Sequence, residues 1–154
     1  MGYIIKTNKL MHIFIILSLL LLSAGCYSNN VDSSINDDSY EVINSMKIVI
    51  NEKEYAIDLE DNETVKKFTD MLPQKLEMQE LNGNEKYVYL DYSLPTNSAN
   101  PKHINAGDVM LFGDNCLVIF YESFDTNYSY TKIGHIDNLP DLGSDDVIVS
   151  FIKG

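Results

Sequence analysis

The fold class of this chain is decided by residues 109–121, which read VMLFGDNCLVIFY. Two apolar segments of strand length flank the turn Gly113-Asp114-Asn115 in this stretch. Because neither segment alternates between apolar and polar residues, the pattern predicts a hairpin that is buried and not half exposed. The rest of the domain must therefore supply elements that cover this hairpin.

Further strands are expected on both sides of this hairpin, bounded by polar turns and by the Asn82-Gly83-Asn84 turn. The predicted strands are residues 46–50, 55–59, 76–81, 86–92, 109–112, 116–121, 132–136 and 147–152. One helix is expected over residues 61–72, with Asn62 or its neighbour as cap and Pro73 as terminator. Residues 93–107 and 123–131 are predicted to be loops. This order predicts a mainly β domain, a small closed or nearly closed barrel of eight strands with one or two helices, over residues 46–153.

The N-terminus has the pattern of a targeting segment. Lys6 and Lys9 precede an apolar run at residues 13–22, and ten helical residues rise only about 15 Å, too short for a permanent anchor. The sequence LSAGC that ends at Cys26 resembles the lipobox of bacterial lipoproteins. We therefore expect a lipoprotein signal peptide at residues 1–25 and lipid attachment at Cys26. An ordinary secretory signal followed by an incidental cysteine is the alternative.

Residues 26–45 are rich in Ser, Asn and Asp, which predicts a disordered tether between the lipid and the barrel. The expected location is extracytoplasmic, with the chain held on the cell membrane as a monomer. The whole chain carries a formal charge of −12, which argues against a nucleic-acid partner. Its 11 basic residues are all lysines, so no guanidinium group is available for any function.

The order of these elements resembles that of bacterial cyclophilin-like proteins. The most specific features are the Gly107-Asp108 turn before a strand and the segment YSYTKIG at residues 128–134. The resemblance implies a barrel with a helix closing one end. It also implies a concave outer surface at the place where true cyclophilins bind prolyl peptides. Some of these bacterial relatives look like domains fused to, or encoded near, flavodoxin-like proteins.

Catalysis of the cyclophilin type is not expected. A cyclophilin isomerase uses a guanidinium group to donate a hydrogen bond to the prolyl nitrogen as the amide twists. Lysine offers a point charge without the planar fork, and the chain has no Trp for the substrate wall. We therefore expect no catalytic residues and a domain that binds an unknown peptide, protein or small ligand. The alternatives are a divergent prolyl isomerase acting on exported proteins and an accessory domain of a flavodoxin-linked redox system.

The candidate ligand-binding residues are aromatic side chains in or beside the loops, together with one histidine in a strand. They are Phe112, Tyr121, Phe124, Tyr128, Tyr130 and His135. The alternative interpretation places the first two of these in the barrel core, uses the other aromatic residues to cover its end, and makes the histidine a hydrogen-bonded structural residue.

No metal or cofactor is expected. The histidines and Cys116 are too far apart in sequence for a zinc signature, and the acidic residues between 137 and 146 lack the spacing of a calcium loop. Phosphate-loop and dinucleotide-binding motifs are absent from the sequence. Cys116 stands in an apolar segment, which predicts a buried and inert thiol.

Overall fold

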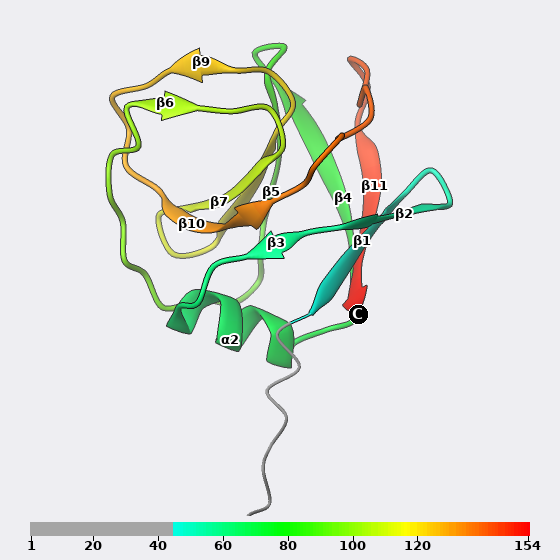
Figure 1. The fold of residues 1–154 in the computed structure, drawn as a ribbon, viewed down its shortest axis with the longest axis horizontal. Coiled ribbons are helices and arrows are strands. Elements are labelled where there is room, and N and C mark those ends of the chain that lie inside the picture. The colour runs from blue at the N-terminus through cyan, green and yellow to red at the C-terminus, as the bar shows by residue number, and fades with distance from the viewer. Residues whose placement is uncertain (1–44) are drawn as a thin grey trace, which may run out of the picture. The chain divides into compact units, whose positions relative to one another are not determined.

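Nine antiparallel strands form one sheet that curls into a nearly closed barrel in the computed structural model, which describes residues 45–154 (Figure 1). The sheet order is β2-β1-β11-β4-β5-β8-β7-β10-β3, and β6 and β9 form a separate two-stranded ribbon. The strands of the sheet are β1 (Met46–Ile50), β2 (Lys53–Ala56), β3 (Asp58–Leu59), β4 (Gln74–Leu81), β5 (Glu85–Tyr89), β7 (Asp108–Phe112), β8 (Cys116–Phe120), β10 (Thr131–His135) and β11 (Val147–Lys153). The prediction of a small, mainly β barrel is confirmed.

The barrel comes close to closing because its two edge strands are neighbours in the chain. β2 pairs with β1 at one edge and β3 pairs with β10 at the other, and only Ile57 separates β2 from β3. The single strand expected over residues 55–59 is thus divided in two. Ile57 is buried in the core at the point where the chain leaves one edge of the sheet for the other.

Two glycines permit close approaches of backbone segments near the end of β10. A Cβ atom on Gly134 of β10 would collide with the backbone oxygen of Asp58 in β3. Gly107 has φ +101°, and a Cβ atom there would lie 2.5 Å from the backbone oxygen of Ile136. Both positions therefore require glycine on steric grounds.

The barrel interior holds the larger of two hydrophobic clusters. Alternate residues of the strands point inward, among them Ile48 of β1, Leu117 of β8 and Phe151 of β11, which are all fully buried. The predicted burial of the hairpin is confirmed for the five residues of β8 and the first four of β7, whereas Phe112 at the end of β7 is exposed.

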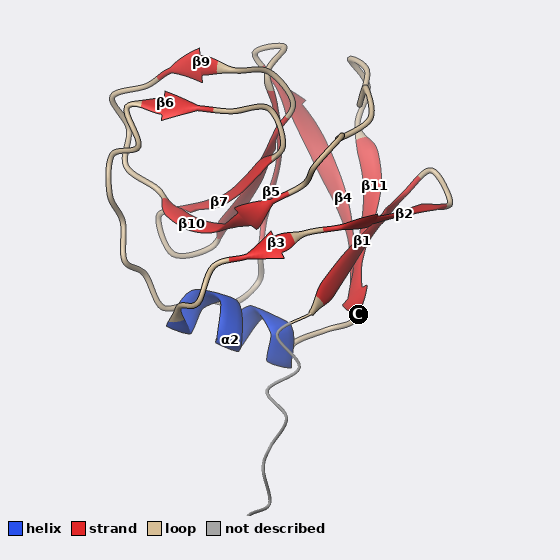
Figure 2. Cartoon of the chain, viewed as in Figure 1, coloured by secondary structure: helices blue, strands red, loops and turns tan. Residues whose placement is uncertain are grey.

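A single helix within the described residues, α2 (Glu63–Asp70), covers one end of the barrel, at the bottom of the view in Figure 2. The Asn62 side chain caps it by accepting a hydrogen bond from the Val65 amide at 2.9 Å. The Phe68 ring enters the barrel and meets Phe151 edge-on, with ring centroids 5.3 Å apart. The predicted helix is confirmed, with its ends drawn in by two residues at each side.

The two expected loops contain a short ribbon. β6 (His103–Ile104) and β9 (Phe124–Asp125) pair with each other, outside the barrel sheet. Two-residue strands give too little alternation to be recognised from sequence.

Lys86 of β5 is fully buried and holds the loop between β10 and β11 against the barrel through hydrogen bonds. Its ammonium group donates hydrogen bonds to the carbonyl oxygens of Gly143 at 2.7 Å and Asp145 at 2.8 Å, and lies 5.1 Å from the centre of the Tyr121 ring. A buried ammonium group is tolerated because its donors are used in this way.

The expected signal peptide at residues 1–25, the lipid-bearing Cys26 and residues 26–44 of the expected tether lie outside the described residues. From residue 45 onward, no helix has the length and apolar character needed to span a bilayer.

Candidate functional site

The outer face of β5 carries Glu85, Tyr87 and Tyr89, because the alternate residues Lys86 and Val88 pack inward. In the β5–β8 pair these three residues lie opposite Phe120, Val118 and Cys116 respectively. Side chains that lie opposite each other in an antiparallel pair share one face of the sheet. The register therefore brings a carboxyl group, two phenols and a thiol to one outer surface of the barrel.

This outer face carries the second hydrophobic cluster, which includes Met110, Val118, Phe120 and Tyr130. The β6–β9 ribbon covers part of it. The Phe124 ring of β9 lies 5.6 Å from that of Phe120, and Tyr130 meets the same ring edge-on at 5.5 Å. The ribbon stops short of the outer residues of β5, which leaves the remainder of the face open.

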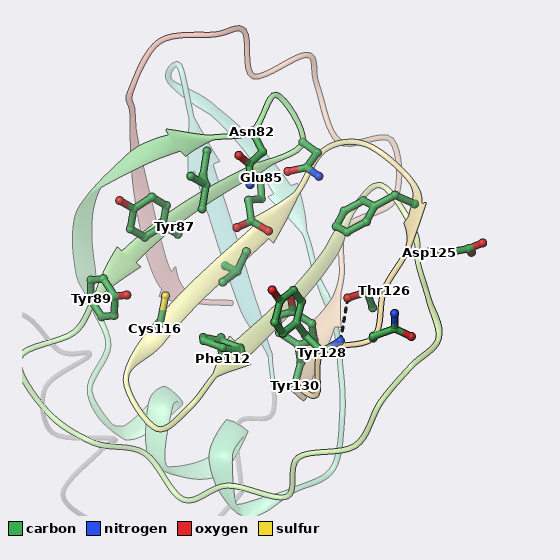
Figure 3. Close-up of a pocket in the computed structure, with 15 residues that line it drawn as sticks. Asn82, Glu85, Tyr87, Tyr89, Phe112, Cys116, Asp125, Thr126, Tyr128 and Tyr130 are labelled. Carbon is green, nitrogen blue, oxygen red and sulfur yellow. Dashed lines mark hydrogen bonds between the residues drawn. The ribbon is translucent and has the colours of Figure 1, made fainter.

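A cavity of about 630 Å³ occupies this open part, and we refer to it below as the outer-face cavity (Figure 3). Its aromatic lining consists of Tyr87, Tyr89, Phe112, Phe124, Tyr128 and Tyr130. Its polar and charged lining consists of Asn82, Asn84, Glu85, Asp125, Thr126 and Asn127. Leu81, Cys116 and Val118 complete the lining. A concave site that combines aromatic and other apolar side chains with hydrogen-bonding groups is typical of binding pockets for small molecules and peptides.

Four of the six candidate residues come together in this cavity. Phe112 lies 6.0 Å from Tyr128 and 5.5 Å from Tyr130, measured between ring centroids, and Phe124 lines the wall formed by the ribbon. The rings of Phe112 and Tyr128 are nearly perpendicular, at 87°. These side chains come from β7, from β9 and from the segment before β10, so the fold joins residues that are distant in sequence.

Tyr121 lies elsewhere. Its ring packs against the interior cluster, and its hydroxyl group donates a hydrogen bond to Glu80 Oε1 at 3.0 Å. Burial, together with this acceptor, raises the pKa of Tyr121 to about 12. The geometry gives Tyr121 a role in joining β4 to the end of β8.

His135 lies at the seam between β7 and β10, outside the lining of the outer-face cavity. Its Nδ1 is 3.0 Å from the carboxylate of buried Asp108, whose other oxygen accepts a hydrogen bond from the Asn105 amide. This arrangement fits a histidine that holds the Gly107-Asp108 turn in place.

The residues that the sequence reasoning missed are those contributed by β5. Tyr87 and Tyr89 alternate with inward-facing residues in the predicted strand at residues 86–92, and Glu85 lies one residue before the predicted start of that strand. The spacing of two was the available signal, since it places all three on one face. Which strand lies next to that face is set by long-range pairing, which the spacing does not reveal.

Three titratable groups in the cavity lining have raised pKa values. Burial raises the pKa of Glu85, and the nearby Glu80 carboxylate raises it further. Burial also raises the pKa of the Cys116 thiol and of the Tyr130 phenol, and the charge of Glu85 adds to both shifts. Cys116 is therefore a protonated, buried thiol at neutral pH, as predicted.

The cavity lining contains no lysine, and the chain contains no arginine, so no cationic donor faces a ligand. Among residues 45–154, no group of three or more His, Cys, Asp and Glu side chains is arranged to hold a metal ion. The aromatic rings, phenol hydroxyls and amide groups offer apolar contact and hydrogen bonds.

Comparison with models of protein families gives a match over most of the described residues. The model of a family described as the cyclophilin-like family matches residues 48–151, a span that includes every strand that lines the outer-face cavity. No curated protein and no solved structure matches the chain.

Proposed function

The chain belongs to the cyclophilin-like family, and on that premise we propose that its barrel is a non-catalytic ligand-binding domain. The ligand, a peptide, protein or small molecule, would be held in the outer-face cavity. The observation that carries this proposal concerns the five large hydrophobic side chains that are exposed within residues 45–154. Four of them, Leu81, Tyr89, Phe112 and Tyr128, line this one cavity.

Such clustering supports binding because exposing apolar surface is unfavourable. Tyr128 is 65% exposed, and its ring would lose contact with water when a ligand covers the cavity. Exposed apolar residues gathered around a hollow mark ligand or partner sites far more often than scattered ones do. The fifth exposed residue, Ile148 of β11, lies outside the cavity lining and provides a natural control.

The lining of the same cavity does not contain the guanidinium donor that cyclophilins use for prolyl isomerisation. Catalysis requires an interaction that is stronger with the twisted amide than with the planar one. A donor aimed at the prolyl nitrogen supplies this in cyclophilins, and the lining offers no cationic donor for that role. Binding by aromatic contact does not depend on such a donor.

A protease-coupled assay with a proline-containing tetrapeptide tests the non-catalytic part of the proposal. The purified protein should give a rate equal to background, while an added cyclophilin gives the positive control. A rate above background that is lost in Tyr128→Ala and kept in Ile148→Ala would establish isomerase activity in this cavity instead.

NMR spectra of the protein with labelled tyrosine rings test the binding part. In a screen of short peptides and aromatic fragments, ligands should shift the resonances of Tyr89 and Tyr128. Tyr55 and Tyr121 lie outside the cavity lining and serve as internal controls. Ligands that shift only the control rings would contradict the proposal.

We further propose that Cys26 carries the lipid that anchors the protein on the outer side of a cell membrane, with residues 26–45 as tether. The LSAGC sequence after the apolar run supports this. Two acyl chains would hold the protein stably where one would not. An alkyne fatty acid fed to cells should label the wild type and not Cys26→Ser, and equal labelling of both would contradict the anchor.

A further inference from the structure

The outer-face cavity holds one carboxylate that faces the ligand space. Glu85 and Asp125 are the acidic residues of its lining. The side chain of Asp125 is 90% exposed and lies 2.7 Å from Nδ1 of His103, so its carboxylate is directed to solvent and already has a hydrogen-bond partner (Figure 3). Glu85 rises from β5 toward the aromatic rings instead.

Glu85 has no stabilising partner within residues 45–154. The two influences on its carboxyl group are burial and the like charge of Glu80, and both disfavour the ionised form. Lys86, its neighbour in sequence, points to the other side of the strand, where it is held by backbone carbonyl groups. A half-buried carboxylate without a cation is costly, so a ligand that brings a positive charge would relieve that cost.

The aromatic rings of the cavity lining favour the same kind of ligand. Tyr87 and Tyr89 meet at 82°, and Phe112 and Tyr128 meet at 87°, so the two pairs present ring faces in several directions. The face of an aromatic ring attracts a cation through its quadrupole. An ammonium group could therefore contact several ring faces while it approaches the carboxylate.

We propose that the outer-face cavity binds an organic cation, a protonated amine or a quaternary ammonium group, held between the Glu85 carboxylate and the surrounding tyrosine rings. This proposal rests on the cavity being a ligand site. The charge of the whole chain, −12, also attracts cations toward it. The amine can belong to a free small molecule or to a lysine side chain of a peptide, because both present the same group.

Calorimetric titration of the purified protein with choline and with neohexyl alcohol, its uncharged carbon isostere, tests the proposal. Choline should bind at least about tenfold more tightly. Glu85→Gln should weaken choline by at least about tenfold and leave the alcohol unchanged. The matched control is Asp125→Asn, which removes a charge from the same lining and should change choline affinity less than about twofold.

The pH profile supplies an independent reading, because choline keeps its charge at every pH. Other titratable groups face Glu85 or the cavity from each neighbouring element. They are Glu80 on β4, Cys116 on β8, Asp125 on β9, Tyr128 and Tyr130 before β10, and Tyr87 and Tyr89 on β5. Choline affinity should rise as the pH rises through the pKa of Glu85, and Glu85→Gln should remove this rise.

A lysine-containing peptide and its acetyl-lysine counterpart distinguish the two sources of the amine. Tighter binding of the peptide than of choline identifies a peptide ligand, and the reverse identifies a small molecule. Equal affinity for choline and the alcohol, or equal losses in Glu85→Gln and Asp125→Asn, would overturn the cation proposal. The binding function would stand in that case if the alcohol still shifts the rings of Tyr89 and Tyr128. Failure of all these probes to bind would also overturn the cation proposal.

Discussion

The β7–β8 hairpin has two buried faces that differ in what covers them. On the inner face, Leu111, Leu117 and Ile119 are fully buried in the barrel, which α2 closes at one end. On the outer face, Phe120 packs against Phe124 of the β6–β9 ribbon, whereas Val118 lines the outer-face cavity that the ribbon leaves open. The inner face of the hairpin packs aliphatic side chains inside the barrel, whereas its outer face adjoins a cavity lined by tyrosines of neighbouring segments. One hairpin thus serves stability on one side and a cavity on the other.

The same contrast recurs in two consecutive residues of β5. Lys86 points inward, is fully buried, and has two carbonyl acceptors. Glu85 points outward, is half-buried, and faces the like charge of Glu80. A charge that is fully partnered contributes to the fold, while one that lacks a partner is available to a ligand. Substitutions on the two faces should therefore separate stability from binding.

The largest effect is expected from Phe68→Ala, which leaves a cavity inside the barrel next to Phe151. The free energy of unfolding should fall by about 3–5 kcal/mol. Phe112→Ala, on the outer face where the ring is partly exposed, should lower it by less than about 1 kcal/mol. Urea denaturation measures both, and equal losses would remove the distinction between the two faces.

Lys86→Met should lower the free energy of unfolding by about 2–3 kcal/mol. The substitution keeps the buried stem but leaves the carbonyl oxygens of Gly143 and Asp145 without a charged donor. Lys153→Met, at the exposed end of β11, is the matched control and should change stability little. A loss below about 0.5 kcal/mol would mean that water replaces the ammonium group at no cost.

Glu85→Gln should have a smaller effect of the opposite sign at neutral pH. The raised pKa means that the folded protein binds a proton more tightly than the unfolded chain. Wild-type stability is therefore fully present below the unfolded pKa of glutamate and falls as the pH rises through the folded pKa. The variant should escape this fall, so that its melting temperature exceeds that of the wild type at pH 7 and not at pH 4. A lower melting temperature for the variant at pH 7 would show that the Glu85 carboxylate has a stabilising partner in the folded protein.

The smallest effect is expected from Tyr128→Ala. The ring is mostly exposed, so the free energy of unfolding should change by no more than about 0.5 kcal/mol. Ligand binding in the outer-face cavity should weaken clearly in the same variant. A large loss of stability with unchanged binding would show that Tyr128 stabilises the fold and does not contact the ligand.

Much of the fold could be predicted because its signals are local. The cap at Asn62, the apolar spacing of the helix, and the two apolar segments around Gly113 each define an element within a few residues. The division of one strand at Ile57 could not be predicted, because it depends on which edge of the sheet each half meets. That is a property of the closed barrel and not of the segment.

The candidate site was predictable in part for the same reason. An aromatic side chain in or beside a loop predicts a binding residue, and this pattern identifies Phe112 and Tyr128, whose rings meet in the cavity. His135 and Tyr121 share that local pattern, yet their hydrogen-bond partners lie in other elements. The spacing of two places Glu85 on the same face as Tyr87 and Tyr89, but which strand lies beside that face depends on the register between β5 and β8.

Photo-cross-linking in intact cells is the most direct test of the claim that the outer-face cavity is where this protein meets its ligand. A benzophenone amino acid would replace Tyr128 in one strain and Ile148 in another. Both side chains are exposed, at 65% and 53%, but only Tyr128 lines the cavity. Specific adducts at position 128 and none at position 148 are the predicted result. Adducts at position 148 alone, or the same adducts at both positions, would contradict the account.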